Sequence, residues 1–296
     1  MKLYNEPFPN IGRPFAVSVG KFDGVHIGHR LILDTLLEEA RRQGLVSVAY
    51  SFEPVNGAAR LTTREEKQAL MESLGVDILI MVELTQELMA MPGEAFITTL
   101  AGCGELKSVA VGRDFRFGRG AVGDVDLLLR LGAGMGFDVH AVEPVTLGGL
   151  PVSSTAIRDA VASGDAGMAS LMLGREYALS GEVVRGRELA RKLGYRTANI
   201  LPPHGKVIPA NGVYAAYVDA GDQAWPAMTN IGVKPTINGS ELLIESHLLG
   251  FDGDLYGKQI TVRLAKRIRD EIKFADVGKL AEQLQRDGEQ VRRILA

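Results

Sequence analysis

The chain has 296 residues, a formal net charge of −3 at pH 7 and one cysteine, Cys103. One cysteine excludes an internal disulfide, and the absence of a basic block excludes the charge pattern of a general nucleic-acid-binding protein. No apolar run reaches the roughly 20 residues that a membrane-spanning helix needs, and residues 1–9 lack the apolar core of a signal peptide. We therefore expect a cytoplasmic protein of about two domains, with neither a nucleic-acid nor a membrane partner.

Strands alternate with helices through the first half of the chain. Apolar or alternating runs predict strands at 15–19, 45–52, 77–82, 107–112 and 138–142. Helical spacing of apolar residues predicts helices at 31–40, 63–74, 92–100 and 126–131. The helix at 63–74 begins with Thr63 and Glu66 placed as in a capping box. This alternation predicts βα units and a parallel sheet.

The pattern changes near Tyr177, where short strand-like segments separated by glycine and proline begin. These segments lie at 181–184, 212–218, 227–231, 242–249 and 259–264. Their spacing predicts a small antiparallel barrel or sandwich, and residues 276–295 predict one amphipathic closing helix. We place the domain boundary between Gly174 and Gly181, which gives domains of residues 1–178 and 179–296.

A first candidate phosphate site is the segment 20–29, Gly-Lys-Phe-Asp-Gly-Val-His-Ile-Gly-His, between the first predicted strand and helix. Strand-to-helix junctions of this kind expose helix amides to a ligand phosphate. The glycines allow close backbone approach, and the histidines can donate to phosphoryl oxygens. Alternatively, they are two partly buried histidines at an ordinary helix start. The candidate residues are Gly20, Phe22, Asp23, Gly24, His26, Gly28 and His29.

A second candidate is the loop 112–120, Gly-Arg-Asp-Phe-Arg-Phe-Gly-Arg-Gly, which follows a predicted strand. Three arginines among glycines would hold an anion, and we include Asp114 among the phosphate-site residues. Equally, Phe115 and Phe117 would anchor the loop in the core and leave the arginines in solvent.

A third candidate is the segment Ser153-Ser154-Thr155, which opens a predicted helix and precedes Arg158 by one turn. Hydroxyls, helix amides and a guanidinium at this spacing can address one polyphosphate. The competing interpretation is simple N-capping by Ser154 or Thr155.

In the second half, Thr197 and Asn199 place two oxygen-bearing side chains two residues apart. If that segment is extended, both point to one face and can coordinate Mg²⁺ beside a nucleotide. Turn hydrogen bonds are the alternative role. Glu245 is a charge within an apolar strand, where it either faces water or serves as a general base.

Together and in this order, these segments resemble the bacterial bifunctional FAD synthetase family, which joins riboflavin kinase to FMN adenylyltransferase. Segments 20–29, 112–118 and 153–158 match three phosphate-site motifs of that family. Further matches in the second half are Gly174 to Tyr177, 197–199, 212–214, 230–236, 251–257 and Arg269 to Phe274.

The resemblance implies a Rossmann-like nucleotidyltransferase domain followed by a six-stranded riboflavin-kinase-like β-barrel with a C-terminal helix. It also implies phosphorylation of riboflavin to FMN and adenylylation of FMN to FAD, with ATP as co-substrate and Mg²⁺ as cofactor. His26 and His29 would then stabilise charge on the phosphates, and Ser154, Thr155 and Arg158 would bind the outgoing pyrophosphate. Glu245 would be the kinase base, with Thr197 and Asn199 holding Mg-ATP.

Three positions in the kinase half depart from the family pattern: Ala190 replaces a glycine, Arg196 a proline and Gly250 an aspartate. We therefore expect an intact adenylyltransferase and a kinase that is slowed or altered. An adenylyltransferase with a flavin-binding second module is the alternative. Two further candidates are a class I aminoacyl-tRNA synthetase, which has a similar His-x-Gly-His motif, and a non-catalytic flavin-binding protein.

Overall fold

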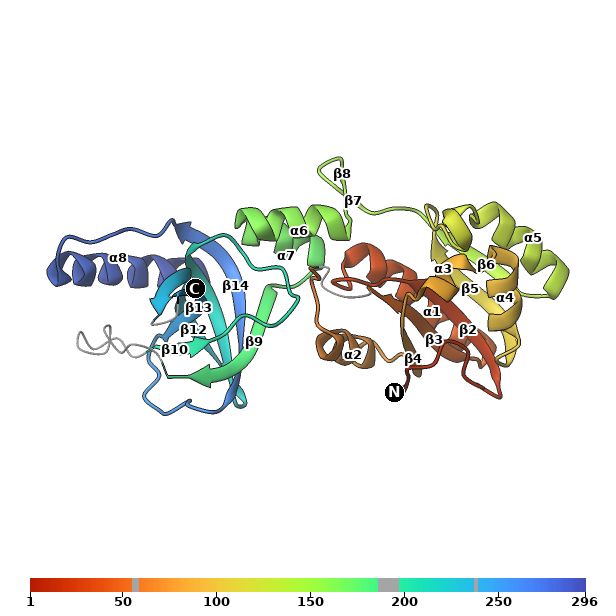
Figure 1. Cartoon of the computed structure of the whole chain (residues 1–296), viewed down its shortest axis with the longest axis horizontal. Coiled ribbons are helices and arrows are strands. Elements are labelled where there is room, and N and C mark those ends of the chain that lie inside the picture. Colours follow the sequence, from red (N-terminus) through yellow and green to blue (C-terminus); the bar gives the residue numbers. More distant parts are fainter. Residues whose placement is uncertain (55–58, 186–196, 237–238) are drawn as a thin grey trace. The chain divides into compact units, whose positions relative to one another are not determined.

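The computed structural model of the protein describes residues 1–54, 59–185, 197–236 and 239–296. These residues form two compact units, Met1–Ser154 and Thr155–Ala296 (Figure 1). The first unit is an α/β domain and the second is built around a barrel, as the sequence predicts.

A six-stranded sheet forms the centre of the first unit, with strand order β1-β4-β3-β2-β5-β6. All five pairings are parallel, which confirms the predicted parallel sheet. The strands are β1 (Lys2–Tyr4), β2 (Pro14–Gly20), β3 (Val46–Glu53), β4 (Ile78–Glu83), β5 (Glu105–Gly112) and β6 (Asp138–Val142). The sequence did not predict β1, because three residues are too few to show a period.

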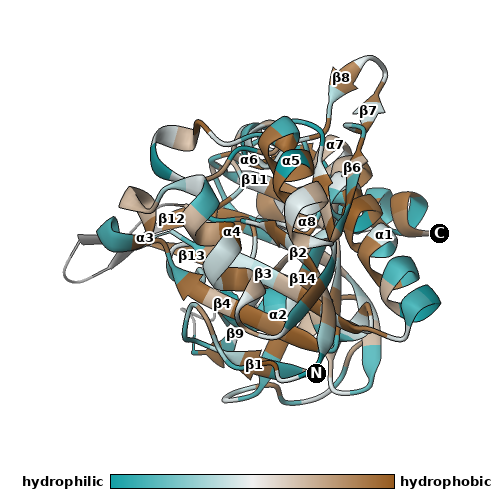
Figure 2. Cartoon of the chain, turned by 90° about the vertical axis from the view of Figure 1, so that its right-hand side faces the viewer, coloured by the Kyte–Doolittle hydropathy of each residue, from teal (hydrophilic) through white to brown (hydrophobic). Residues whose placement is uncertain are grey.

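Helices cover both faces of this sheet. Residues of α1 (Ile27–Gln43) and α2 (Arg64–Ser73) pack on one face, where the strands present mostly small side chains such as Ala16, Ala49 and Ala110. In Figure 2, α1 shows brown, hydrophobic residues on part of its surface and teal residues elsewhere. The predicted capping box at the start of α2 is present, with Thr63 and Glu66 bonded reciprocally.

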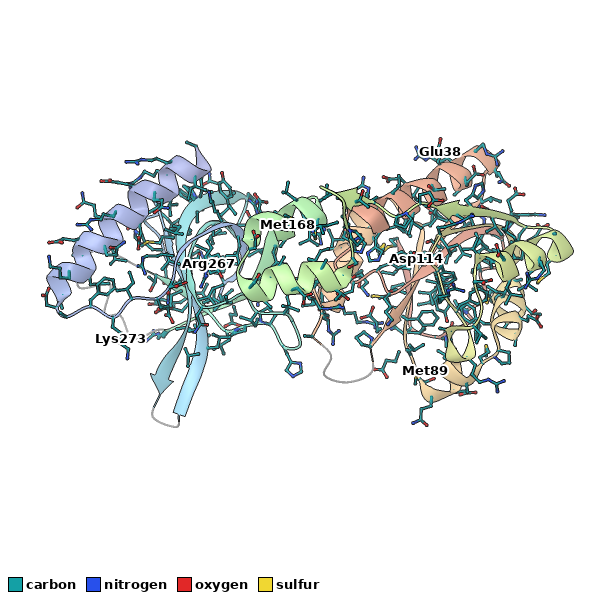
Figure 3. All side chains as sticks on the ribbon, turned by 90° about the horizontal axis from the view of Figure 1, so that it is seen from above. Glu38, Met89, Asp114, Met168, Arg267 and Lys273 are labelled. Carbon is teal, nitrogen blue, oxygen red and sulfur yellow. The ribbon has the colours of Figure 1, made fainter. Side chains whose placement is uncertain are left out.

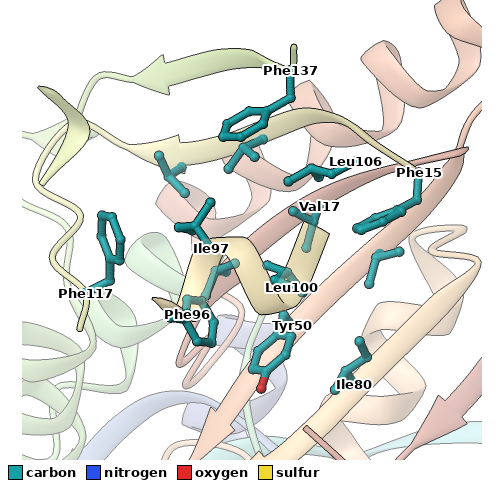
Figure 4. Close-up of a cluster of buried hydrophobic side chains, with 14 of the residues drawn as sticks. Phe15, Val17, Tyr50, Ile80, Phe96, Ile97, Leu100, Leu106, Phe117 and Phe137 are labelled. Atoms are coloured by element: carbon teal, nitrogen blue, oxygen red, sulfur yellow. The ribbon is translucent and has the colours of Figure 1, made fainter. Parts of the chain in front are cut away.

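The opposite face carries α4 (Gly93–Ala101) and α5 (Val125–Met135) over a larger apolar cluster. Figure 4 shows Phe96, Ile97 and Leu100 of α4 above strand residues that include Tyr50 and Ile80. Each such side chain contributes roughly 1.5–3 kcal/mol when it is fully buried. This core therefore fixes the strand ends that carry the candidate site.

The direction of strand addition reverses between β2 and β5. The chain leaves β2 toward β3 on one side and later returns to β5 on the other. In open α/β sheets, ligands bind outside the carboxyl ends of strands at such a switch point. Segment 20–29 follows β2 and segment 112–120 follows β5, so two of the three predicted phosphate motifs lie at this point.

The second unit contains a closed six-stranded barrel in the order β10-β13-β12-β11-β14-β9, as predicted. All of its pairings are antiparallel. The strands are β9 (Tyr177–Val184), β10 (Ala198–Ile200), β11 (Gly212–Ala220), β12 (Gln223–Thr236), β13 (Gly239–Leu248) and β14 (Gln259–Arg269).

Helix α8 (Val277–Leu295) closes the second unit, and Asp276 caps it by accepting from the amide of Lys279. Its buried Val291 packs on Val213, Ala215 and Met228 of the barrel. The guanidinium of Arg269 at the end of β14 meets the carboxylate of buried Asp287 at 2.6 Å. The helix is therefore fixed to the barrel by apolar contacts and by this ion pair.

Several elements of the structure were not predicted from the sequence. They are α3 (Gln86–Ala90), a 3₁₀ turn η1 (Arg119–Ala121), the short hairpin of β7 (Thr146–Leu147) and β8 (Leu150–Pro151), α7 (Ala166–Leu173) and the barrel strand β10. Helix α6 (Ser154–Ser163) begins at the predicted hydroxyl motif. Because α7 packs on β14 and β9, contacts group α6 and α7 with the barrel, whereas we predicted them in the first domain. The functional boundary at residue 178 stays a prediction.

Candidate active sites

His26 and His29 form one stacked pair at the start of α1. His26 is the N-cap residue, and its Nδ1 accepts from the amide of His29 at 3.2 Å. An accepting Nδ1 is unprotonated, so neutral His26 carries its proton on Nε2, where it can donate. The two rings lie 3.6 Å apart between centroids, and Phe22 contacts His29 edge-on. The alternative that these are histidines at an ordinary helix start is therefore confirmed in part, because His26 caps α1.

The backbone ahead of these histidines follows an unusual path. Phe22 and Val25 have positive φ values of 46° and 39°, which are rare for residues with a side chain. Gly24 has φ 83°, where glycine is the natural choice. At Gly28 the constraint is space, because a Cβ would lie 3.2 Å from the imidazole of His26. Strain of this kind persists only where surrounding contacts impose it.

Three hydrogen bonds impose that path. The amide of Leu61 donates to the Asp23 carboxylate at 2.8 Å, and the amide of Gly24 donates to Oγ1 of Thr62 at 3.2 Å. The hydroxyl of Ser154 donates to the carbonyl of Asp23 at 2.8 Å, although the two residues are 131 positions apart. The first and third predicted motifs therefore meet in the first unit, and Ser154 acts as a tether there.

The environment of His29 favours its neutral form. Burial, followed by the nearby His26 and Lys67, holds the pKa of His29 well below its ordinary value of 6.5. Its Nδ1 is buried and has no hydrogen-bond partner among the described residues. A buried polar atom without a partner calls for an explanation, and a bound ligand supplies one.

This lowered pKa predicts an acid-sensitive first unit. A group whose folded pKa is depressed contributes stability that is present above its unfolded pKa and lost as pH falls below it. We expect the free energy of unfolding of the first unit to fall as pH drops from about 7 through the ordinary histidine range. Urea denaturation at several pH values measures this, and the variant His29→Asn should show a flatter dependence. Equal slopes in both proteins would contradict the prediction.

The second motif is held by its aromatic residues. Phe117 belongs to the buried core, and the ring of Phe115 stacks on it with centroids 5.4 Å apart. Arg116 pairs with Asp124 at 3.1 Å, and Asp114, which Figure 3 labels, belongs to the same loop. Its side chain is exposed. The predicted anchoring role of the phenylalanines is confirmed, and anion binding by Asp114 and its neighbours stays a prediction.

The third motif divides at the boundary between the units. Ser154 is bonded within the first unit, whereas Thr155 and Arg158 belong to the second. The guanidinium of Arg158 donates to Oγ1 of Thr155 at 3.2 Å, as residues three apart on a helix can. The approach of Ser153, Thr155 and Arg158 to the histidine pair stays a prediction.

A polar row crosses three strands of the barrel. The strand registers place Asn199 of β10 opposite Glu245 of β13, and Glu245 opposite Asn230 of β12. Cross-strand partners point to the same face of a sheet. The neighbouring Ile200 and Ile244 are fully buried in the barrel interior, so the polar row lies on its outer face.

Asn199 is nevertheless only 3% exposed, and its Oδ1 has no hydrogen-bond partner among the described residues. Thr197 directly precedes β10, and its shared orientation with Asn199 stays a prediction. The role of Glu245 as a base also stays a prediction. The strand register places Glu245 opposite Asn199, the predicted metal-binding residue.

Sequence reasoning assigned no role to Asn230 or Glu271. The side-chain amide of Asn230 donates to the carboxylate of Glu271 at 3.2 Å. A Cβ on Gly232 would collide with that same carboxylate. Glu271 belongs to the segment after β14, which also contains the Lys273 labelled in Figure 3. Its carboxylate therefore contacts the polar row through Asn230. Spacing alone gives no sign of this contact.

Of the three departures from the family pattern, only Gly250 lies within the described residues. It has φ 82°, and a Cβ there would meet nothing within 4 Å. Glycine therefore suits the backbone at that turn, and the space is open. Ala190 and Arg196 lie outside the described residues.

Neither a membrane span nor a carboxylate-rich metal site is found within residues 1–54, 59–185, 197–236 and 239–296. No helix in these ranges is long and apolar enough to cross a membrane. They contain no cluster of three or more histidine, cysteine, aspartate or glutamate side chains that could hold a metal. The cytoplasmic location stays a prediction.

A candidate site at the switch point of an α/β sheet and a second candidate site on a β-barrel are the arrangement expected of a two-domain nucleotide-dependent transferase. The FAD synthetase family model matches residues 9–156, and the riboflavin kinase family model matches residues 173–295. A bifunctional riboflavin kinase/FMN adenylyltransferase of Escherichia coli K12 is 40% identical, with 92% of this chain and 90% of that protein covered. A Pseudomonas fluorescens protein of the same description is 37% identical, with 96% and 94% covered.

The chain therefore belongs to the bifunctional riboflavin kinase/FMN adenylyltransferase family, which confirms the resemblance found in the sequence. A crystal structure from Streptococcus pneumoniae, described as a macrolide-efflux protein, matches with a TM-score of 0.90 and 27% identity over 99% of both chains. The efflux description belongs to that protein, and the match shows that the two chains share a fold.

Proposed function

We propose that the first unit transfers the adenylyl group of ATP to FMN, and that the barrel transfers the γ-phosphoryl group of ATP to riboflavin. Together the two reactions make FAD from riboflavin, which is the chemistry of the family to which this chain belongs. The observation that supports the first site best is the bond from Ser154 to Asp23, because it joins two phosphate motifs at the switch point. The kinase site is supported by the row of Asn199, Glu245 and Asn230.

In the first reaction, a phosphate oxygen of FMN attacks the α-phosphorus of ATP, and the bond to the leaving pyrophosphate breaks. Charge builds on the phosphoryl oxygens during this transfer. The amides at the start of α1 and the Nε2 proton of His26 are donors suited to stabilise that charge. His29 completes the pair, and Thr155 and Arg158 receive the pyrophosphate. Such transfers depend on positioning and charge stabilisation, so no covalent enzyme intermediate is needed.

In the second reaction, the 5′-hydroxyl of riboflavin attacks the γ-phosphorus of a second ATP, and ADP leaves. The carboxylate of Glu245 accepts the proton of that hydroxyl, which makes the oxygen a better nucleophile. Asn230 lies beside Glu245 in register and can orient the same substrate. This assignment keeps the two reactions on separate sets of residues.

Mg²⁺ fits the kinase residues that we assigned to it. Asn199 has a buried carbonyl oxygen without a partner among the described residues, and amide and hydroxyl oxygens are ligands that Mg²⁺ accepts alongside substrate phosphates. Thr197 and Asn199 would hold the ion, with the nucleotide supplying further oxygens. Bound there, the ion would neutralise phosphate charge.

Two parallel incubations test the proposal. The purified chain is mixed with Mg-ATP and riboflavin in one, and with Mg-ATP and FMN in the other, and the flavins are separated by chromatography. We expect FMN and then FAD in the first and FAD in the second. FAD from FMN alone would leave only the adenylyltransferase, and no product in either would favour a flavin-binding protein.

A further inference from the structure

Lys67 is a buried cation that the proposed chemistry does not use. It lies on α2 with only 3% of its surface exposed. Its ammonium donates to the carbonyl of Lys21 at 2.8 Å, to the hydroxyl of Ser51 at 3.0 Å and to the carboxylate of Glu53. The three acceptors match the three N–H donors of a lysine, so every donor has a partner.

The acceptors come from two adjacent strand ends. Lys21 follows β2, whereas Ser51 and Glu53 end β3, and Gly20 pairs with Ser51 in the sheet. The hydroxyl of Ser51 also reaches the carbonyl of Lys21 at 3.2 Å and the carboxylate of Glu53 at 3.2 Å. The ammonium therefore joins these two strand ends at the sheet edge that carries the first phosphate motif.

The stability of the fold does not by itself explain why a lysine is buried at this position. Burying a charge pair costs desolvation free energy, and well-packed apolar residues often replace buried pairs with no loss of stability. Burial lowers the pKa of Lys67, and the charge of Glu53 opposes that shift. A methionine would fill nearly the same volume, but it could not donate to the carbonyl of Lys21.

That carbonyl precedes the strained part of the loop. Phe22 with φ 46° comes directly after it, and the histidine pair follows within eight residues. Thr62, which accepts from Gly24, lies on the segment that leads into α2. The chain from Leu61 to Lys67 therefore holds the loop at Lys21, Asp23 and Gly24.

We propose that Lys67 is a positioning residue for adenylyl transfer, because its ammonium holds the carbonyl of Lys21 and so fixes the loop that carries His26 and His29. This inference rests on the proposed function of the first unit. Misplacement of reacting groups by about 1 Å can cost on the order of 100-fold in rate. Loss of the tether should therefore slow the reaction without preventing folding.

Three variants separate the tether from simple charge compensation. Glu53→Gln removes the carboxylate and keeps the bond to Lys21, whereas Lys67→Met removes the ammonium and that bond. The double variant removes that bond and both charges of the pair, so only the partly exposed Arg60, 3.8 Å from Glu53 in the parent, loses its counter-charge. We expect at least a tenfold loss of kcat for FAD formation from FMN with Lys67→Met and with the double variant. Glu53→Gln should lose less than threefold.

Thermal melting reports the folded fraction, and FMN formation from riboflavin in the same sample reports the other activity of the chain. The matched control is Arg64→Met, because Arg64 is a cation on α2 that donates to the carbonyl of Met81 instead of the loop. We expect unchanged FMN formation in all variants, and full FAD formation in the control.

Recovery of parental FAD formation by the folded double variant would overturn the inference, because Lys67 would then only balance Glu53. A first unit that fails to fold in both Lys67 variants would also overturn it, since the network would be a folding requirement. Equal losses of kcat for FAD formation with Glu53→Gln and Lys67→Met would also overturn the inference. A parent chain that makes no FAD from FMN would instead overturn the proposed function, and this inference with it.

Discussion

Replacement of His29 by alanine should reduce kcat for FAD formation from FMN by roughly 100- to 1000-fold, the range seen when one donor to a developing oxyanion is removed. His29 stacks on the N-capping His26 at the switch point, with a buried nitrogen that has no partner among the described residues. Formation of FMN from riboflavin should stay within twofold of the parent, because the barrel residues that we assign to that reaction belong to the other unit. Separate assays with FMN and with riboflavin measure the two rates.

The matched control for this variant is His140→Ala. His140 is also partly buried and lies on β6 of the same unit, near Glu39 and outside the three phosphate motifs. We expect its loss to leave FAD formation nearly unchanged. A folded His29→Ala protein that makes FAD within threefold of the parental kcat would rule out a role for His29 in the transfer. A raised KM with unchanged kcat would assign it to substrate binding alone.

Much of the fold follows from local sequence patterns. Buried parallel strands are continuous apolar runs, and helices show their apolar spacing and their caps, so β2 to β6 and α2 with Thr63 were predictable. The closed barrel was harder, because short strands with turn residues fit a barrel and a sandwich equally. The grouping of α6 and α7 with the barrel depends on tertiary packing, which no local pattern contains.

The motifs of the candidate sites could be predicted from the sequence, but the contacts between distant residues in those sites could not. Glycines, histidines and hydroxyls at strand-to-helix junctions indicated phosphate binding. However, the bond from Ser154 to Asp23 joins residues 131 positions apart, and the burial of Lys67 on an otherwise polar helix turn contradicts its usual place in solvent. Likewise, only the register of β10, β13 and β12 reveals that Asn199, Glu245 and Asn230 form one row.

Replacement of Glu245 by glutamine should reduce kcat for FMN formation from riboflavin by roughly 100- to 10,000-fold, the usual contribution of a positioned general base. Glutamine keeps the size of the side chain and its place opposite Asn199 and Asn230, but its amide cannot accept the hydroxyl proton at neutral pH. The KM for riboflavin should therefore change much less than kcat. FAD formation from added FMN should be unchanged, so this variant and His29→Ala should fail in opposite assays.

Glu182→Gln is the matched control for Glu245→Gln, because Glu182 is an exposed strand carboxylate of the same barrel that pairs with Gln259 instead of the polar row. A Glu245→Gln protein with the parental kcat would show that the carboxylate only faces solvent, which was the alternative interpretation of this charge in an apolar strand. The parental rate itself then tests the departures from the family pattern. A parent that phosphorylates riboflavin slowly while Glu245→Gln lowers the rate further would show a weakened but working kinase, because a base has an effect only where the transfer still occurs.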